Sequence, residues 1–199
     1  AITIDPSSAA VCTSANALCT QVTICQPNTA NCQTIADVLV DTGSSGLRIF
    51  ASAVRIPLAS SNLGECMYFG SGTEWGPVHT VDVILGGEPA VLVPIQVIDP
   101  TFAGQYTPTG QPASNICGMG VVDSSPVQAG FNGILGVGLF PFDGGVYYNC
   151  AALSCAAVAV SASQQVQNPV GLLPVDNNGV LVALPAVPAS GSPSVTGSL

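Results

Sequence analysis

Short apolar runs alternate with turns rich in glycine, proline, asparagine and serine along the chain. Apolar runs that contain β-branched residues and are bounded by turn residues are typical of β-strands. The best helix candidate is 151–163, although its mixture of alanine and valine also suits a strand. The pattern therefore predicts an all-β chain with one or two short helices. The expected strands are 21–25, 36–40, 47–50, 66–69, 78–85, 90–98, 170–175 and 180–184.

Two of the turns predict hairpins. Gly70, Ser71 and Gly72 lie near the tip between the strands at 66–69 and 78–85. The sequence Asp-Asn-Asn-Gly at 176–179 joins the strands on either side of it. Residues 194–199 resemble the opening of another strand, so we expect the sequence to be interrupted there.

Composition excludes several functions. The chain has 199 residues, of which 48% are hydrophobic and 7% charged, and its formal net charge is −9. With Arg48 and Arg55 as the only cations, it cannot neutralise a run of nucleic-acid phosphates or form a polybasic membrane patch. A single histidine, His79, excludes a multi-histidine metal site. No stretch of eighteen apolar residues is present, so we expect no membrane span.

Eight cysteines indicate a disulfide framework and an oxidising compartment, so the predicted location is secreted or periplasmic. The alternative is zinc, which usually needs two closely spaced cysteine pairs, and the spacings here do not favour it. The turn at 26–31 suggests a bond across a hairpin, and the last two cysteines close a short loop. Of the 105 connectivities that eight cysteines allow, we choose Cys12–Cys19, Cys25–Cys32, Cys66–Cys117 and Cys150–Cys155 as the prediction.

The most informative segment is Val38-Leu39-Val40-Asp41-Thr42-Gly43-Ser44-Ser45-Gly46-Leu47. An apolar strand ends in the carboxylate of Asp41, and a loop of small residues follows at once. Gly43 allows tight backbone geometry, and the hydroxyls of Thr42 and Ser44 can hold the carboxylate. The alternative is that Asp41 only caps a turn.

Here the chain resembles the pepsin-like aspartic peptidases, whose signature is two hydrophobic residues followed by Asp-Thr-Gly-Ser-Ser. The segment from Phe69 to Thr73 is similar to the flap hairpin that closes over substrate in that family. The segment 131–138 is similar to the glycine-containing strand that crosses behind the catalytic loop and braces it. Residues 176–199 resemble the hairpin that ends the amino-terminal lobe. The resemblance implies one psi-loop barrel or sandwich lobe at 36–199, preceded at 1–35 by a cysteine-rich segment with the first hairpin.

The resemblance implies a peptide or protein substrate and hydrolysis without a cofactor or metal. Asp41, Thr42, Gly43 and Ser44 would form the catalytic loop, while Tyr68, Phe69, Gly70 and Ser71 would form the flap. Two carboxylates are needed to activate one water, because like-charge repulsion separates their pKa values. The other aspartates, including Asp37, Asp82, Asp99, Asp123, Asp143 and Asp176, lack the motif. We expect the second carboxylate from a carboxy-terminal lobe or, alternatively, from a homodimer mate.

Two positions depart from the family. The flap tyrosine is replaced by Phe69, with Tyr68 adjacent, and the aromatic residue after the signature leucine is replaced by Arg48. In the family these two side chains contact each other, so both changes affect one coupling. Together with the cysteine spacing, they indicate a distant, bacterial branch. They also keep open a catalytically inactive pepsin-fold protein that binds or inhibits, and a cell-surface structural module.

Other motifs are weaker. The glycines at 133, 136 and 138 are in the reverse order of a dinucleotide fingerprint. His79 could pair with a serine in a hydrolase, but no Gly-x-Ser-x-Gly is present. The turn at 176–179 lacks the spacing of a calcium loop. The acidic composition predicts that stability is maintained near pH 4, because few ion pairs would be broken there.

Overall fold

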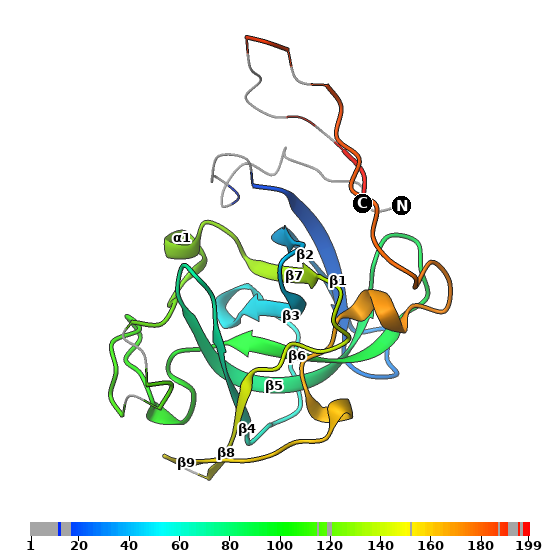
Figure 1. Cartoon of the computed structure of the whole chain (residues 1–199). Helices are drawn as coiled ribbons and strands as arrows, with labels where there is room; N and C mark the ends of the chain where they lie inside the picture. Colours follow the sequence, from blue (N-terminus) through cyan, green and yellow to red (C-terminus); the bar gives the residue numbers. More distant parts are fainter. Residues whose placement is uncertain are drawn as a thin grey trace.

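The structure is a computed structural model that describes residues 12, 17–114, 116–118, 121–151, 153–186, 188–190, 195 and 197–199. The described residues form an all-β fold built on a nine-stranded sheet, as the sequence predicts (Figure 1). Its strands are β1 (Cys19–Cys25), β2 (Cys32–Asp41), β3 (Ser45–Phe50), β4 (Leu63–Tyr68), β5 (Thr73–Ile84), β6 (Val91–Ile98), β7 (Gly133–Val137), β8 (Val146–Ala151) and β9 (Ser154–Ala157).

Helical elements are few and short. The one α-helix of the described part is α1 (Pro126–Ala129), which Ser125 caps by accepting a hydrogen bond from Gln128 N. The 3₁₀ turns are η1 (Ala51–Ala53), η2 (Phe102–Gly104), η3 (Ala162–Gln164) and η4 (Pro169–Leu172).

The sheet closes into a barrel because β1 pairs with β5 as well as with β2. The order around the ring is β1, β2, β7, β3, β6 and β5. The long strand β5 joins this ring to a second layer: its first half pairs with β4 and its second half with β6. Strands β8 and β9 then extend the sheet beyond β4 (Figure 1).

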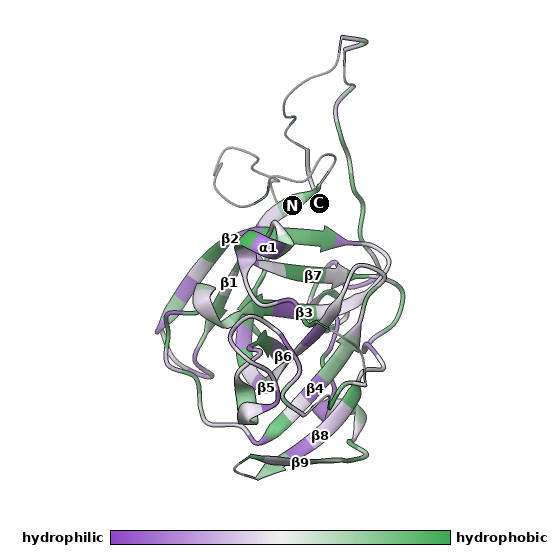
Figure 2. Ribbon diagram, turned by 90° about the vertical axis from the view of Figure 1, so that its left-hand side faces the viewer, coloured by the Kyte–Doolittle hydropathy of each residue, from purple (hydrophilic) through white to green (hydrophobic). Residues whose placement is uncertain are grey.

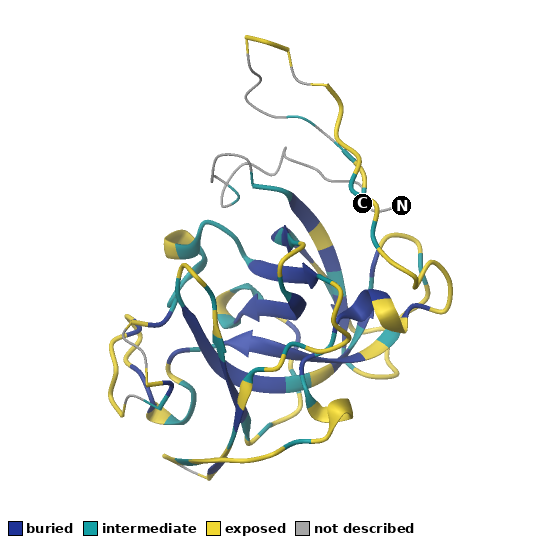
Figure 3. Cartoon of the chain, viewed as in Figure 1, coloured by how far each residue is buried: buried dark blue, intermediate teal, exposed yellow. Residues whose placement is uncertain are grey.

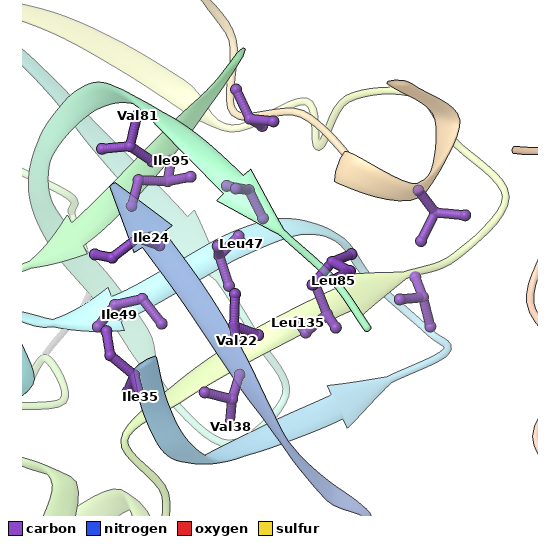
Figure 4. Close-up of a cluster of buried hydrophobic side chains, with 14 of the residues drawn as sticks. Val22, Ile24, Ile35, Val38, Leu47, Ile49, Val81, Leu85, Ile95 and Leu135 are labelled. Atoms are coloured by element: carbon purple, nitrogen blue, oxygen red, sulfur yellow. The ribbon is translucent and has the colours of Figure 1, made fainter. Parts of the chain in front are cut away.

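Alternation of apolar and polar residues positions the core inside the barrel, because successive side chains of a strand point to opposite faces. Figure 2 shows apolar and polar segments alternating along several strands. Strands β3 and β7 and most of β6 are buried, whereas β9 and most loops are exposed (Figure 3). The core (Figure 4) includes Val22, Leu47, Ile49, Ile95 and Leu135, all of which are fully buried. A second cluster surrounds Trp75 beneath the β4–β5 hairpin.

All four predicted disulfides are present, which confirms the predicted connectivity. The bonds Cys25–Cys32 and Cys150–Cys155 each join directly opposed residues of a hairpin. Four disulfide bonds are compatible with an extracellular or periplasmic location. Among the residues described, no helix is long and apolar enough to cross a membrane.

The predicted helix at 151–163 is wrong. The segment forms the end of β8, then β9, and later the short turn η3. Cys150 and Cys155 face each other across β8 and β9, so their bond favours a hairpin over a helix at this point. A sequence of alanine and valine suits either structure, and the tertiary pairing with β8 decides between them.

The predicted hairpin between 170–175 and 180–184 is also wrong. Residues 169–172 form η4, with Val170 packed into the barrel core. The partner of Ala183 is instead Ser198, through an isolated antiparallel bridge. Two residues of the expected strand at 194–199, at positions 194 and 196, lie outside the described residues. The division proposed between residues 35 and 36 falls within β2, which is continuous across it.

Candidate functional site

Asp41 is the last residue of β2, where the chain leaves the barrel for the loop at 42–44. β2 runs parallel to β7, and β3 runs antiparallel to β7 on its other side. The loop therefore connects two strands that are separated by a third, and β7 lies directly behind it. Asp41 is opposite Gly136 in this register.

Two glycines allow β7 to lie close to the loop. A Cβ atom on Gly136 would lie 2.8 Å from the backbone and hydroxyl of Ser44, which is closer than real Cβ atoms come. One on Gly138 would lie 2.7 Å from the Ser44 carbonyl oxygen, which accepts a hydrogen bond from Gly138 N at 2.7 Å. The glycine-rich segment thus supports the loop from behind, as expected from the sequence.

The Asp41 carboxylate is half-buried and is oriented by the backbone. Gly43 N donates a hydrogen bond to Asp41 Oδ1 at 2.8 Å. The expectation that the Ser44 hydroxyl holds this carboxylate is wrong, because the Ser44 Oγ atom is buried without a hydrogen-bond partner. The carboxylate is instead oriented by the backbone turn, because Gly43 brings its N–H group within hydrogen-bonding distance of Asp41.

Asp41 lies at a pocket of about 540 Å³ between the loop and the β4–β5 hairpin. The hairpin tip closes on itself through a hydrogen bond from Phe69 N to Gly72 O at 2.8 Å. A third wall comes from the segment that follows β7. The lining residues are Asp41, Thr42, Gly43, Ser44, Ser45, Met67, Tyr68, Phe69, Gly70, Gly138, Leu139, Phe140 and Asp143.

Seven of the eight predicted catalytic-loop and flap residues therefore meet at one pocket, and Ser71 is the exception because it lies at the hairpin tip outside the lining. Tyr68 lines the pocket, but its hydroxyl donates to the Cys117 carbonyl oxygen at 2.5 Å. The hydroxyl is therefore engaged with the disulfide-linked loop.

A buried charge cluster lies behind the pocket and was not expected from the sequence. The Arg48 guanidinium is fully buried and forms ion pairs with Glu65 and Asp143. The same side chain donates from Nη1 to the Ser45 carbonyl oxygen at 3.0 Å. The Asp143 carboxylate also accepts hydrogen bonds from Tyr147 Oη and Gly145 N. The sequence did contain one indication of this cluster. Arg48, one of only two cations, lies between Leu47 and Ile49 in an apolar strand, and a buried cation needs a partner of opposite charge.

The carboxylates of this cluster differ in protonation. Burial raises the pKa of Glu65 well above its usual range despite the nearby Arg48. Burial also opposes ionisation of Asp143, but its hydrogen bond with Glu65 and the charge of Arg48 bring its pKa below the usual value. Burial thus disfavours the charged form of Glu65, whereas the contacts of Asp143 favour its charged form. Burial raises the pKa of the nearby Glu74 to about 8.

Arg48 and Phe69, the two positions that differ from the pepsin-like pattern, lie close together in the structure. The Arg48 guanidinium carbon lies 5.6 Å from the centre of the Phe69 ring, within the range of a cation–π interaction. A cation and an aromatic ring therefore form a contact between the β2–β3 region and the hairpin tip.

The weaker motifs have local structural roles. The His79 Nδ1 atom lies 2.9 Å from the Ala59 carbonyl oxygen, and burial lowers its pKa. The turn at 176–179 is exposed. Within the part of the chain that the structure describes, no group of three histidine, cysteine, aspartate or glutamate residues is placed to hold a metal ion.

The class defined by these observations is an all-β barrel with a carboxylate in a pocket beneath a hairpin. One protein family matches residues 1–199, and its description is "Protein of unknown function (DUF3443)". The chain belongs to this family. No curated protein matches the sequence.

Proposed function

We propose that this chain is the amino-terminal half of an exported aspartic endopeptidase. Asp41 would supply one of two carboxylates that activate a water for attack on a peptide bond. The ionised carboxylate accepts a proton from the water, and the protonated one donates a hydrogen bond to the peptide carbonyl oxygen. The observation that carries the proposal is the position of Asp41, half-buried at a pocket that also receives the hairpin tip.

The second carboxylate would come from another unit. Asp143 also lines the pocket, but its side chain is fully buried and paired with Arg48, so it is unsuited to this role. The partner would therefore be an equivalent aspartate of a carboxy-terminal lobe or of a second copy of this chain. The substrate would be an extended peptide or protein segment lying between the loop and the hairpin.

The test compares the complete gene product and the 199-residue chain with their Asp41→Asn variants, using a casein-type substrate between pH 3 and 7. Asparagine keeps the size of the side chain but cannot accept the proton. We expect cleavage by the complete product and a loss of at least about 100-fold on substitution. Folded protein that cleaves nothing over this range would overturn the proposal. So would a complete product that lacks a second Asp-Thr-Gly or Asp-Ser-Gly and does not dimerise.

One observation favours a second candidate, a pepsin-fold protein that binds peptides without cleaving them. Phe69 has no hydroxyl, and that of Tyr68 is engaged with Cys117. The hairpin therefore offers the pocket no tyrosine hydroxyl from these two positions. Peptide binding that survives Asp41→Asn, without turnover by either protein, would support this candidate.

A further inference from the structure

Arg48 connects the walls of the Asp41 pocket. It donates to Ser45 O, at the end of the 42–44 loop, and it pairs with Glu65 on β4. It also pairs with Asp143 in the segment after β7, and its guanidinium faces the ring of Phe69 at the hairpin tip. One side chain thus contacts the loop that carries Asp41, both neighbouring walls and the hairpin.

The guanidinium is held firmly from behind. Its Nη2 atom contacts both Glu65 and Asp143, and Asp143 is itself held by Tyr147 and Gly145. A Cβ atom on Gly145 would lie 2.2 Å from Glu65 Oε1, so the chain packs tightly against the cluster here. The planar fork of arginine suits several simultaneous contacts, which a lysine ammonium cannot reproduce in the same geometry.

Other attachments of the tip are at its base, where Thr73 O accepts a hydrogen bond from Asp123 N at 2.9 Å and Thr73 forms an isolated bridge with Val122. Gly70 and Ser71 are exposed, and the tip is closed by its own backbone hydrogen bond from Phe69 to Gly72. Tyr68, at the base of the tip, donates a hydrogen bond to the Cys117 carbonyl oxygen. The Phe69 ring therefore makes the contact that draws the tip toward Asp41, because it lies over a cation fixed in the pocket wall.

We infer that Arg48 is a positioning residue that holds the β4–β5 hairpin over Asp41 through the face of Phe69. The inference extends the proposed function, since a hairpin held in this way would order a peptide against the carboxylate. The inference predicts an energetic coupling between Arg48 and Phe69, which can be measured without enzymatic turnover.

The experiment is a double-mutant cycle read by hydrogen exchange of the backbone amides at 66–74. The variants are Phe69→Leu, Arg48→Lys and the double variant, in the complete protein. Phe69→Leu should increase exchange at the tip about 5- to 30-fold, as expected for loss of a largely desolvated cation–π contact. Arg48→Lys should act in the same direction, and the double variant should add little to either change. Phe69→Tyr keeps the ring and should exchange like the wild type.

Phe131→Leu is the matched control, because its ring contacts Phe50 rather than Arg48, and it should leave exchange at 66–74 unchanged. Arg48 variants risk unfolding because they disturb the pairing of buried carboxyl groups, whereas the Phe69 variants leave these groups intact. Wild-type exchange in Phe69→Leu, or fully additive effects, would overturn the inference.

Kinetics form a separate arm of the same experiment. If the protein cleaves peptides, Phe69→Leu should raise KM and lower kcat. Phe69→Tyr, which keeps the ring, should leave both near their wild-type values. Coupled exchange without turnover by wild-type protein would support the hairpin contact and refute the peptidase. Turnover without coupled exchange would support the peptidase and refute the hairpin contact.

Discussion

Glu74 provides a direct test of the electrostatics behind the pocket. It lies on β5 just beyond the hairpin tip, is 1% exposed, and has an Oε2 atom without a hydrogen-bond partner. Because burial disfavours the charged form, its pKa is raised from 4.5 to about 8. The change we propose is Glu74→Gln, which keeps the size of the side chain and removes its ionisation.

The sign follows from proton linkage. Below pH 4.5 Glu74 is protonated in both folded and unfolded protein, so its full contribution to stability is present. As the pH rises toward 8, the unfolded chain loses this proton first, and the free energy of unfolding falls. Between pH 5 and pH 8 this one group lowers the free energy of unfolding by about 3–4 kcal/mol. Glu65 acts in the same direction, because its pKa is also raised.

The assay is urea unfolding at about pH 5 and pH 8 with disulfides intact, followed by the fluorescence of the single, buried Trp75. Glu74→Gln should gain about 3–4 kcal/mol relative to wild type between the two pH values, or roughly 10 °C in Tm. Comparing the pH values removes any constant effect of the amide. Glu88→Gln, at a partly exposed position in the turn after β5, is the control for loss of a charge.

Two results would refute this reasoning. Wild-type stability that is flat or rises from pH 5 to pH 8 would contradict the raised pKa of Glu74 and Glu65. Equal pH dependence of stability in Glu74→Gln and wild type would show that Glu74 does not contribute to the trend. The predicted trend agrees in direction with the expectation from composition that the protein stays stable near pH 4. Asp143 has the opposite effect, but only in stronger acid. Because its pKa is lowered in the folded protein, its contribution to stability is lost as the pH falls below the usual pKa of an aspartate.

Two further predictions concern packing and the disulfide framework. Gly136→Ala should destabilise the protein by about 1–3 kcal/mol and displace the loop behind Asp41, because the new Cβ would lie 2.8 Å from Ser44. Urea unfolding checks this, and Gly171→Ala, which meets nothing within 4 Å, is the control that should change stability much less. Replacing both Cys66 and Cys117 with serine should cost about 4 kcal/mol, since their bond closes a long loop. Removing the short bond between β8 and β9 should cost about half as much, and equal losses would contradict the loop-entropy argument.

The local parts of the fold were predictable from the sequence because local patterns govern them. Apolar alternation identified most barrel strands, and turn residues located the β4–β5 hairpin. The turn at 26–31 and the short loop at 150–155 indicated two of the disulfide bonds, whereas the other two were one choice among many and were settled by the structure. The motif around Asp41 also placed this residue at the end of a buried strand, since apolar residues lead directly into a glycine-containing loop.

Tertiary structure decided what depends on distant partners. The segment 151–163 could form a helix or a strand, and pairing with β8 determined the outcome. Asp143 lies far from Arg48 in the sequence, and nothing local indicates that the two are paired. The contact between Arg48 and Phe69 likewise exists only because the fold brings β3 and the hairpin tip together. Single residue patterns report which face of a strand is buried, but the partner that satisfies a buried charge is set by how the strands assemble.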